Sequence, residues 1–199
     1  MSDRGARGWR RRVRKLRRRR GLLTIGALAL VIGGGVGYLA WSGATATGRP
    51  APSFILPDSE GRPVALANYL GRKPIVLIFY MSHDRAGCRA QLGKLRPELD
   101  QIRGLGAEVM AISADRTDDA KRMARELEFA LPVLSDPKLD VISSYSMQGP
   151  HSRTADMGYV LIDPAGRIRT RQVDHRFGEH AGEIIRGLER ITRVEASQR

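Results

Sequence analysis

The hydrophobic pattern of this chain falls into two parts, a long apolar stretch near its start and shorter apolar runs after it. Residues 21–42 contain no charged side chain. A helix of these 22 residues would rise about 33 Å, which matches a bilayer hydrocarbon core of about 30 Å. Tyr38 and Trp41 stand near its far end, where interfacial aromatic side chains are common. We therefore predict a transmembrane helix over residues 21–43.

After this stretch the pattern becomes that of a folded domain. The run 75–80 (IVLIFY) is uniformly apolar and has the length of a buried strand. The segment after it is predicted to be a helix, because its apolar residues recur at steps of four, three, four and three on one face: Cys88, Leu92, Leu95, Leu99 and Ile102. Pro97 lies within this helix and is expected to kink it.

The remaining apolar runs extend the same alternation of strands and helices. Strands are predicted over 108–113, 131–134, 159–163 and 168–173, and helices from Thr117, over 138–146 and over 179–193. The last two strands flank the turn Pro164-Ala-Gly166 and are predicted to form a hairpin. The order βαβα followed by ββα predicts an α/β, thioredoxin-like fold, a mixed sheet flanked by helices on both faces.

The net charge of +13 is concentrated at the start of the chain. Residues 1–20 hold 11 of the 34 Lys and Arg residues and one acid, so the rest of the chain is close to neutral. A basic domain would favour nucleic-acid binding, but a basic tail beside an apolar span is typical of the cytoplasmic end of a membrane anchor. We therefore predict no nucleic-acid partner, a cytoplasmic tail over 1–20, and a single-pass cell-membrane protein whose domain is extracytoplasmic (periplasmic).

The apolar stretch has a second interpretation, a cleaved signal peptide with Ala44-Thr45-Ala46 as its cleavage site. The stretch exceeds the roughly 7–15 apolar residues of a signal peptide, which favours an uncleaved signal anchor over 21–43. The predicted organisation continues with a linker over 44–52, a thioredoxin-like domain over 53–193 and a C-terminal tail over 194–199.

Cys88 is the only cysteine, and its place in the pattern suggests chemistry. One cysteine excludes an intramolecular disulfide framework, an iron–sulfur cluster and a four-cysteine zinc site. Cys88 follows a buried strand by a short polar loop and opens a helix, where backbone N–H groups and the helix dipole stabilise a thiolate. Arg85 and Arg89 add positive charge nearby. The position also suits a small structural residue, because free cysteine is among the most buried residue types.

Several segments, in order, resemble the peroxiredoxins, and more specifically the thiol-specific antioxidant branch that includes the bacterioferritin-comigratory type. The resemblance covers about residues 50–192 and rests on APSFILPDSEGRPVAL (51–66), YLG (69–71), IVLIFY followed by a Gly-Cys pair, AISAD (111–115), LSDP (134–137) and YVLIDPAGRI (159–168). It implies a peroxiredoxin-type sheet and places Cys88 at the family's peroxidatic cysteine.

The family's active-site pattern, Pro-x-x-x-Thr-x-x-Cys, is altered in this chain. Met81 stands at the proline position and Arg85 at the threonine position. The family also brings an arginine to the thiolate from just before the late strand; that position is Met157 here, with Arg153 as the nearest substitute. The resemblance therefore implies Cys88 as the nucleophile, with Arg85 and Arg153 as candidate donors to the bound peroxide.

A thiol-dependent peroxidase that reduces hydroperoxides is the activity implied by the resemblance. Because the chain has no second cysteine, turnover requires a one-cysteine mechanism. The sulfenate would be reduced by an external thiol (a thioredoxin-like protein or a small thiol) or by Cys88 of a second molecule in a homodimer. The cysteine count excludes a C-x-x-C reductase, and neither a cofactor nor a metal ion is expected. The altered motif favours one alternative, a non-catalytic thioredoxin-fold module at the membrane that binds a partner protein.

Overall fold

The computed structural model describes residues 48–82, 85–128, 131–149 and 153–197. Residues Ala46–Arg199 form one compact unit. The predicted basic tail (1–20) and transmembrane helix (21–43) lie outside the described residues. Among the helices that are described, none is both long enough and apolar enough to cross a membrane.

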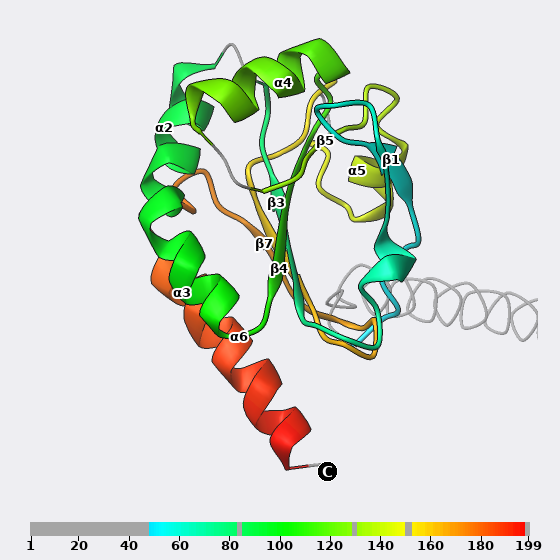
Figure 1. Ribbon diagram of the computed structural model, residues 1–199, viewed down its shortest axis with the longest axis vertical. Helices are drawn as coiled ribbons and strands as arrows, with labels where there is room; N and C mark the ends of the chain where they lie inside the picture. Colours follow the sequence, from blue (N-terminus) through cyan, green and yellow to red (C-terminus); the bar gives the residue numbers. More distant parts are fainter. Residues whose placement is uncertain (1–47, 83–84, 129–130, 150–152, 198–199) are drawn as a thin grey trace, which may run out of the picture. The chain divides into compact units, whose positions relative to one another are not determined.

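A five-stranded mixed sheet forms the centre of the domain, in the order β5-β4-β3-β6-β7 (Figure 1). Its middle strand β3 (Ile75–Phe79) runs parallel to β4 (Glu108–Ser113) and antiparallel to β6 (Gly158–Ile162). Strand β5 (Val133–Ser135) extends the parallel side, and β7 (Ile168–Val173) completes a hairpin with β6. The predicted mixed sheet and late hairpin are confirmed.

Separate hydrophobic cores lie on the two faces of the sheet. The other elements are β1 (Ile55–Pro57), β2 (Pro63–Ala65), η1 (Leu66–Asn68), α2 (Ala86–Leu95), η2 (Arg96–Glu98), α3 (Leu99–Gly104), α4 (Thr117–Glu126), α5 (Asp140–Ser144) and α6 (Ala181–Ala196). Because side chains alternate along a strand, Val76 and Ile78 face the core under α2, α3, α4 and α6, whereas Leu77 faces the core under β1, η1 and α5. Figure 1 shows these two layers on opposite sides of the sheet.

The helix predicted after β3 is interrupted at Pro97, and the chain instead forms α2, the short turn η2 and α3. Proline lacks an N–H group, and its ring clashes with the carbonyl four residues earlier, so an α-helix does not continue through it unchanged. The predicted apolar face is nevertheless continuous across α2 and α3. All five of its residues are buried: Cys88, Leu92, Leu95, Leu99 and Ile102.

The first described residues lie along the β6–β7 turn, although they were predicted to end a linker. The Ala51 N–H donates to the Gly166 carbonyl at 2.8 Å, and the Ile168 N–H donates to the Arg49 carbonyl at 2.9 Å. Backbone hydrogen bonds therefore fix the chain to the domain from residue 49 onward.

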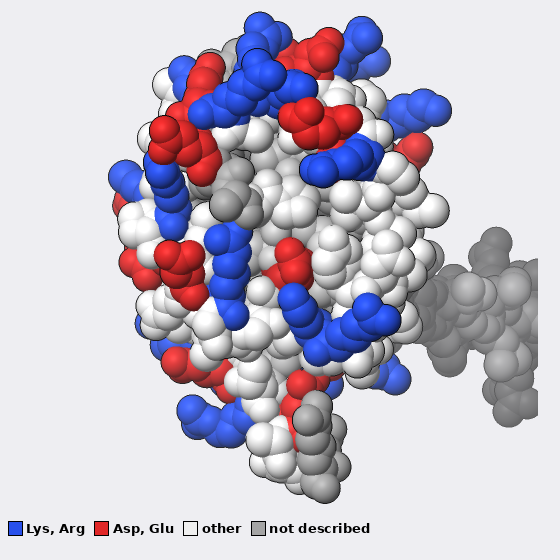
Figure 2. Space-filling model, viewed as in Figure 1, with Lys and Arg blue, Asp and Glu red and all other residues white. Residues whose placement is uncertain are grey.

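Charges of both signs are mixed over the domain surface. Figure 2 shows Lys and Arg side chains interspersed with Asp and Glu on the face in view. Several of them pair across elements, including Lys94 with Glu179 at 2.8 Å and Arg96 with Glu128 at 2.7 Å. Exposed pairs of this kind stabilise a fold only weakly. The mixture fits a chain whose excess positive charge lies in residues 1–20.

Candidate active site

Cys88 lies in the first turn of α2, just after the loop that leaves the carboxyl end of β3. Arg85 precedes the helix, and its carbonyl accepts the Cys88 N–H at 2.9 Å. The Cys88 side chain points into the core and is only 1% exposed. It therefore combines a position at a helix N-terminus with an environment closed to solvent.

Hydrogen bonds join the loop before Cys88 to the loop after β4. The Ser82 hydroxyl donates to an Asp115 carboxylate oxygen at 2.8 Å, and the Asp115 N–H donates to the Ser113 hydroxyl oxygen at 3.2 Å. The Ser135 hydroxyl, at the end of β5, donates to the Asp115 carbonyl at 2.6 Å. These contacts gather the carboxyl ends of three neighbouring strands, the edge at which open α/β sheets usually carry their sites.

Met157 is the residue whose side chain meets the thiol. Its Sδ atom lies 3.8 Å from Cys88 Sγ, and the Met157 side chain is 5% exposed. Met157 directly precedes Gly158, where a Cβ atom would lie 2.0 Å from the Gln172 carbonyl oxygen. Only glycine lets β7 approach this closely, and that approach fixes the end of β6. The structure thus places a thioether against the cysteine at the position where the family pattern has a guanidinium.

Tyr80 is a site residue that stands out in the sequence only as the end of an apolar run. The β3–β6 register pairs Phe79 with Gly158, so the next residues along, Tyr80 and Met157, face one another beyond the last pair. Tyr80 belongs to the same core as Cys88 and Met157, and its side chain is 0% exposed. The signal that could have identified it is a hydroxyl group at the end of an otherwise entirely apolar run.

The Tyr80 hydroxyl has no hydrogen-bond partner among the residues that the structure describes. Burial raises the pKa of Tyr80 well above its ordinary value, and the charges of Asp115 and Cys88 raise it further. The nearby Ser113 hydroxyl acts in the opposite direction and lowers this pKa. Tyr80 therefore keeps its proton and is a buried donor in the same core as the thiol.

The two arginines predicted as donors have exposed side chains. Arg85 directly precedes α2, and Arg153 lies shortly before β6. Within the described residues neither guanidinium contacts Cys88, whose sulfur contacts Met157 instead. Their roles toward a bound peroxide stay predictions.

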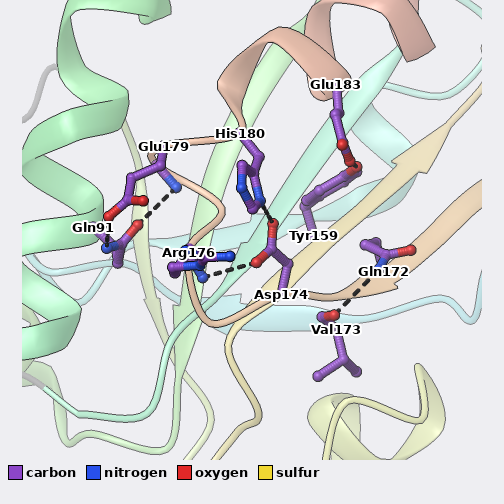
Figure 3. A network of polar contacts seen from close by, with 10 residues as sticks. Gln91, Tyr159, Gln172, Val173, Asp174, Arg176, Glu179, His180 and Glu183 are labelled. Atoms are coloured by element: carbon purple, nitrogen blue, oxygen red, sulfur yellow. Dashed lines mark hydrogen bonds and ion pairs between the residues drawn. The ribbon is translucent and has the colours of Figure 1, made fainter.

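The next turn of α2 is attached to the segment that leads into α6 (Figure 3). The Gly178 N–H donates to Gln91 Oε1 at 3.1 Å, and Gln91 Nε2 donates to a Glu179 carboxylate oxygen at 3.4 Å. A Cβ atom on Gly178 would lie 2.0 Å from the Gln91 carbonyl oxygen, so this approach also requires glycine. In the same segment Asp174 pairs with His180 at 2.7 Å. These contacts hold the helix that carries Cys88 against the domain.

Comparison with protein families identifies the family to which this fold belongs. The AhpC/TSA family model matches residues 47–171, more than half of the chain. This chain belongs to the AhpC/TSA family. Peroxiredoxin Bcp of Escherichia coli (strain K12) is 29% identical over 147 residues, which cover 71% of this chain and 94% of that protein. Chloroplastic peroxiredoxin Q of Sedum lineare is 37% identical over 89 residues, 45% of this chain and 47% of that protein.

Solved structures show the same fold for this AhpC/TSA protein. Peroxidoxin BcpB from Mycobacterium tuberculosis superposes with a TM-score of 0.65 at 24% identity, covering 74% of this chain and 98% of that one. Enterococcus faecalis AhpC gives a TM-score of 0.70 at 22% identity, and the match covers 78% of this chain and 97% of that one. The predicted thioredoxin-like, peroxiredoxin-type fold is confirmed, and the protein is a thiol-dependent peroxidase of the peroxiredoxin type.

Proposed function

We propose that this peroxiredoxin reduces hydroperoxides through Cys88 alone, with the reducing thiol supplied by another molecule. The observation that carries the proposal is the position of Cys88, the chain's single cysteine, in the first turn of α2 in an AhpC/TSA fold. The thiolate is the nucleophilic form of cysteine, and the chain offers no other thiol.

The reaction follows from the chemistry of one thiol. The Cys88 thiolate attacks one oxygen of the peroxide; an S–O bond forms, the O–O bond breaks, and the leaving alkoxide or hydroxide takes up a proton. The product is a sulfenic acid on Cys88. An external thiol then attacks this sulfur with release of water, and a second thiol breaks the mixed disulfide and restores Cys88. A thioredoxin-like protein, a small thiol or Cys88 of a second molecule fits this role.

Two kinds of donor are proposed to stabilise the peroxide as charge develops on its leaving oxygen. The Tyr80 hydroxyl is already inside the site and is unpartnered among the described residues. Arg85 lies three residues before Cys88, and Arg153 lies four residues before Met157. Both side chains are exposed and would have to turn inward to act. Because the Cys88 side chain is 1% exposed, the first turn of α2 also has to open before an external thiol reaches Sγ.

Peroxide consumption by the purified full chain tests the proposal. With hydrogen peroxide and dithiothreitol, Cys88→Ser is expected to lower the rate at least about 100-fold, to background, because the nucleophile is lost. Circular dichroism checks that the variant folds, and Ala90→Ser, at an exposed position of α2, is the matched control. Equal rates in wild type and Cys88→Ser would overturn the assignment of the reaction to Cys88 and favour the non-catalytic partner-binding module.

We further propose that residues 21–43 anchor the domain on the extracytoplasmic face of the cell membrane. The support is the 22-residue uncharged stretch preceded by a tail with 11 Lys and Arg residues. In bacterial cells the full chain is expected in the membrane pellet after a carbonate wash. Leu30→Arg should release it, because a charge at a helix centre costs about 3 kcal/mol on insertion, whereas Leu30→Ile should not. A soluble mature chain cut after Ala46 would contradict the anchor.

A further inference from the structure

We propose that the Met157 thioether is an internal acceptor for the oxygen atom that Cys88 takes from peroxide, so that Met157 becomes a sulfoxide and Cys88 returns to the thiol. The inference rests on the proposed reaction of Cys88 and adds a second fate for its sulfenic acid. It is carried by the contact between the two sulfur atoms, 3.8 Å apart in the core.

Both sulfur atoms are held in place by the fold. Cys88 sits in the first turn of α2, and the Met157 carbonyl accepts the Asp174 N–H at 2.8 Å. The close approach of β7 at Gly158 fixes the next residue along. An external thiol has to reach a sulfur that is 1% exposed, whereas the thioether already touches it. Groups held in contact react as if one were present at very high concentration, so the internal acceptor has a large kinetic advantage.

Tyr80 supplies an independent indication that this position receives a polar atom. Tyr80 is opposite Met157 in the continued β3–β6 register, and its hydroxyl is fully buried in the same core and lacks a partner among the described residues. A buried donor without an acceptor is costly, and such groups are concentrated where a ligand or reacting atom arrives. An oxygen atom on Cys88 Sγ would provide the missing acceptor, and the hydrogen bond would polarise the S–O bond.

The transfer balances in atoms and electrons. A lone pair on Met157 Sδ attacks the sulfenic oxygen; the Sδ–O bond forms, and the O–Sγ bond breaks with its electron pair passing to Sγ. The proton of the sulfenic acid moves to the Cys88 thiolate. Met157 is oxidised by two electrons and Cys88 is reduced by two, with peroxide as the original oxidant. One equivalent of peroxide thus leaves a thiol and a methionine sulfoxide, and reversal requires a sulfoxide-reducing reaction.

Mass spectrometry of the full chain after hydrogen peroxide treatment, without added thiol, tests this transfer. Trypsin releases residues 154–167, in which Met157 is the only methionine, and 139–153, in which Met147 is the only one. Met147 is also fully buried but belongs to the core on the other face of the sheet. Met157 is expected to be oxidised at least about tenfold faster than Met147, because its oxidant is delivered by a neighbour. In Cys88→Ala that excess should disappear.

Trapping of the Cys88 sulfenic acid with dimedone separates this inference from the proposed function. Met157→Leu, which nearly preserves side-chain volume, should prolong the period during which the acid can be trapped. Trapped sulfenic acid without excess Met157 oxidation would overturn the internal transfer and leave the peroxidase assignment intact. Equal Met157 oxidation in Cys88→Ala would also overturn it. Failure to form sulfenic acid in any variant would overturn both proposals.

Discussion

Replacing Gly158 with alanine is expected to destabilise the domain by more than about 2 kcal/mol, in the range of substitutions that strain a buried backbone. Gly158 has a φ angle of 154°, and an added Cβ atom would lie 2.0 Å from the Gln172 carbonyl oxygen. That oxygen belongs to the backbone of β7, which cannot rotate away as a side chain can. The hairpin would have to open where Gly158 pairs with Val173.

Thermal unfolding followed by circular dichroism measures this effect. For a domain of this size, a loss of 2 kcal/mol lowers the melting temperature by about 4–8 °C. Gly93→Ala in α2 is the matched control, because its Cβ atom would meet only Leu127 Cδ2, at an ordinary 3.9 Å. Alanine is favoured over glycine inside a helix by about 0.5–1 kcal/mol, so this variant should melt higher. A melting temperature for Gly158→Ala equal to that of the wild type would contradict the close approach of β7.

Removing the Tyr80 hydroxyl should both stabilise the fold and slow the oxidation of Cys88 by peroxide. An unsatisfied buried polar group costs about 1–3 kcal/mol, so Tyr80→Phe is expected to gain about 1 kcal/mol in unfolding free energy. The same hydroxyl is the proposed donor to oxygen at Cys88. Its loss should therefore lower the rate of Cys88 oxidation by about tenfold or more, as expected for the removal of one preorganised donor.

Tyr145→Phe provides the opposite case. Tyr145 is equally buried, but its hydroxyl donates to the Pro52 carbonyl at 2.7 Å and lies in the other core. Its removal should cost about 1 kcal/mol and leave the rate of Cys88 oxidation unchanged. Stopped-flow measurement of peroxide oxidation, combined with thermal unfolding, tests both variants. A Tyr80→Phe protein that is less stable than wild type would show that the hydroxyl has a partner in solution.

The architecture of the domain could be predicted from the sequence because each helix or strand has a recognisable hydrophobic pattern over a few consecutive residues. The apolar run 75–80 forms β3 and the residue that follows it, Tyr80. The spacing of apolar residues by three and four predicted the buried helix face that contains Leu92, Leu95 and Leu99. The sequence predicted one helix with a kink at Pro97, and at that residue the chain forms α2, η2 and α3. Periodicity shows which side of a helix is apolar, not whether its backbone continues unbroken.

The residues that make up the site were harder to predict from the sequence. Alignment with the family pattern drew attention to Arg85 and Arg153 as candidate donors, and both side chains are exposed. Tyr80 carried no signal beyond its place at the end of a strand. A motif specifies spacing along the chain, whereas the neighbours of a side chain depend on how distant segments pack.

By itself the sequence determined the fold family and the buried strand and helix face that position Cys88. Those properties depend on residue type and local spacing alone. Only the tertiary structure decided that Met157, 69 residues away along the chain, touches Cys88, and that Tyr80 is buried in the same core with a hydroxyl that has no partner among the described residues. These relations arise from the antiparallel register of β3 with β6 and the packing of α2 over it, which no local pattern encodes.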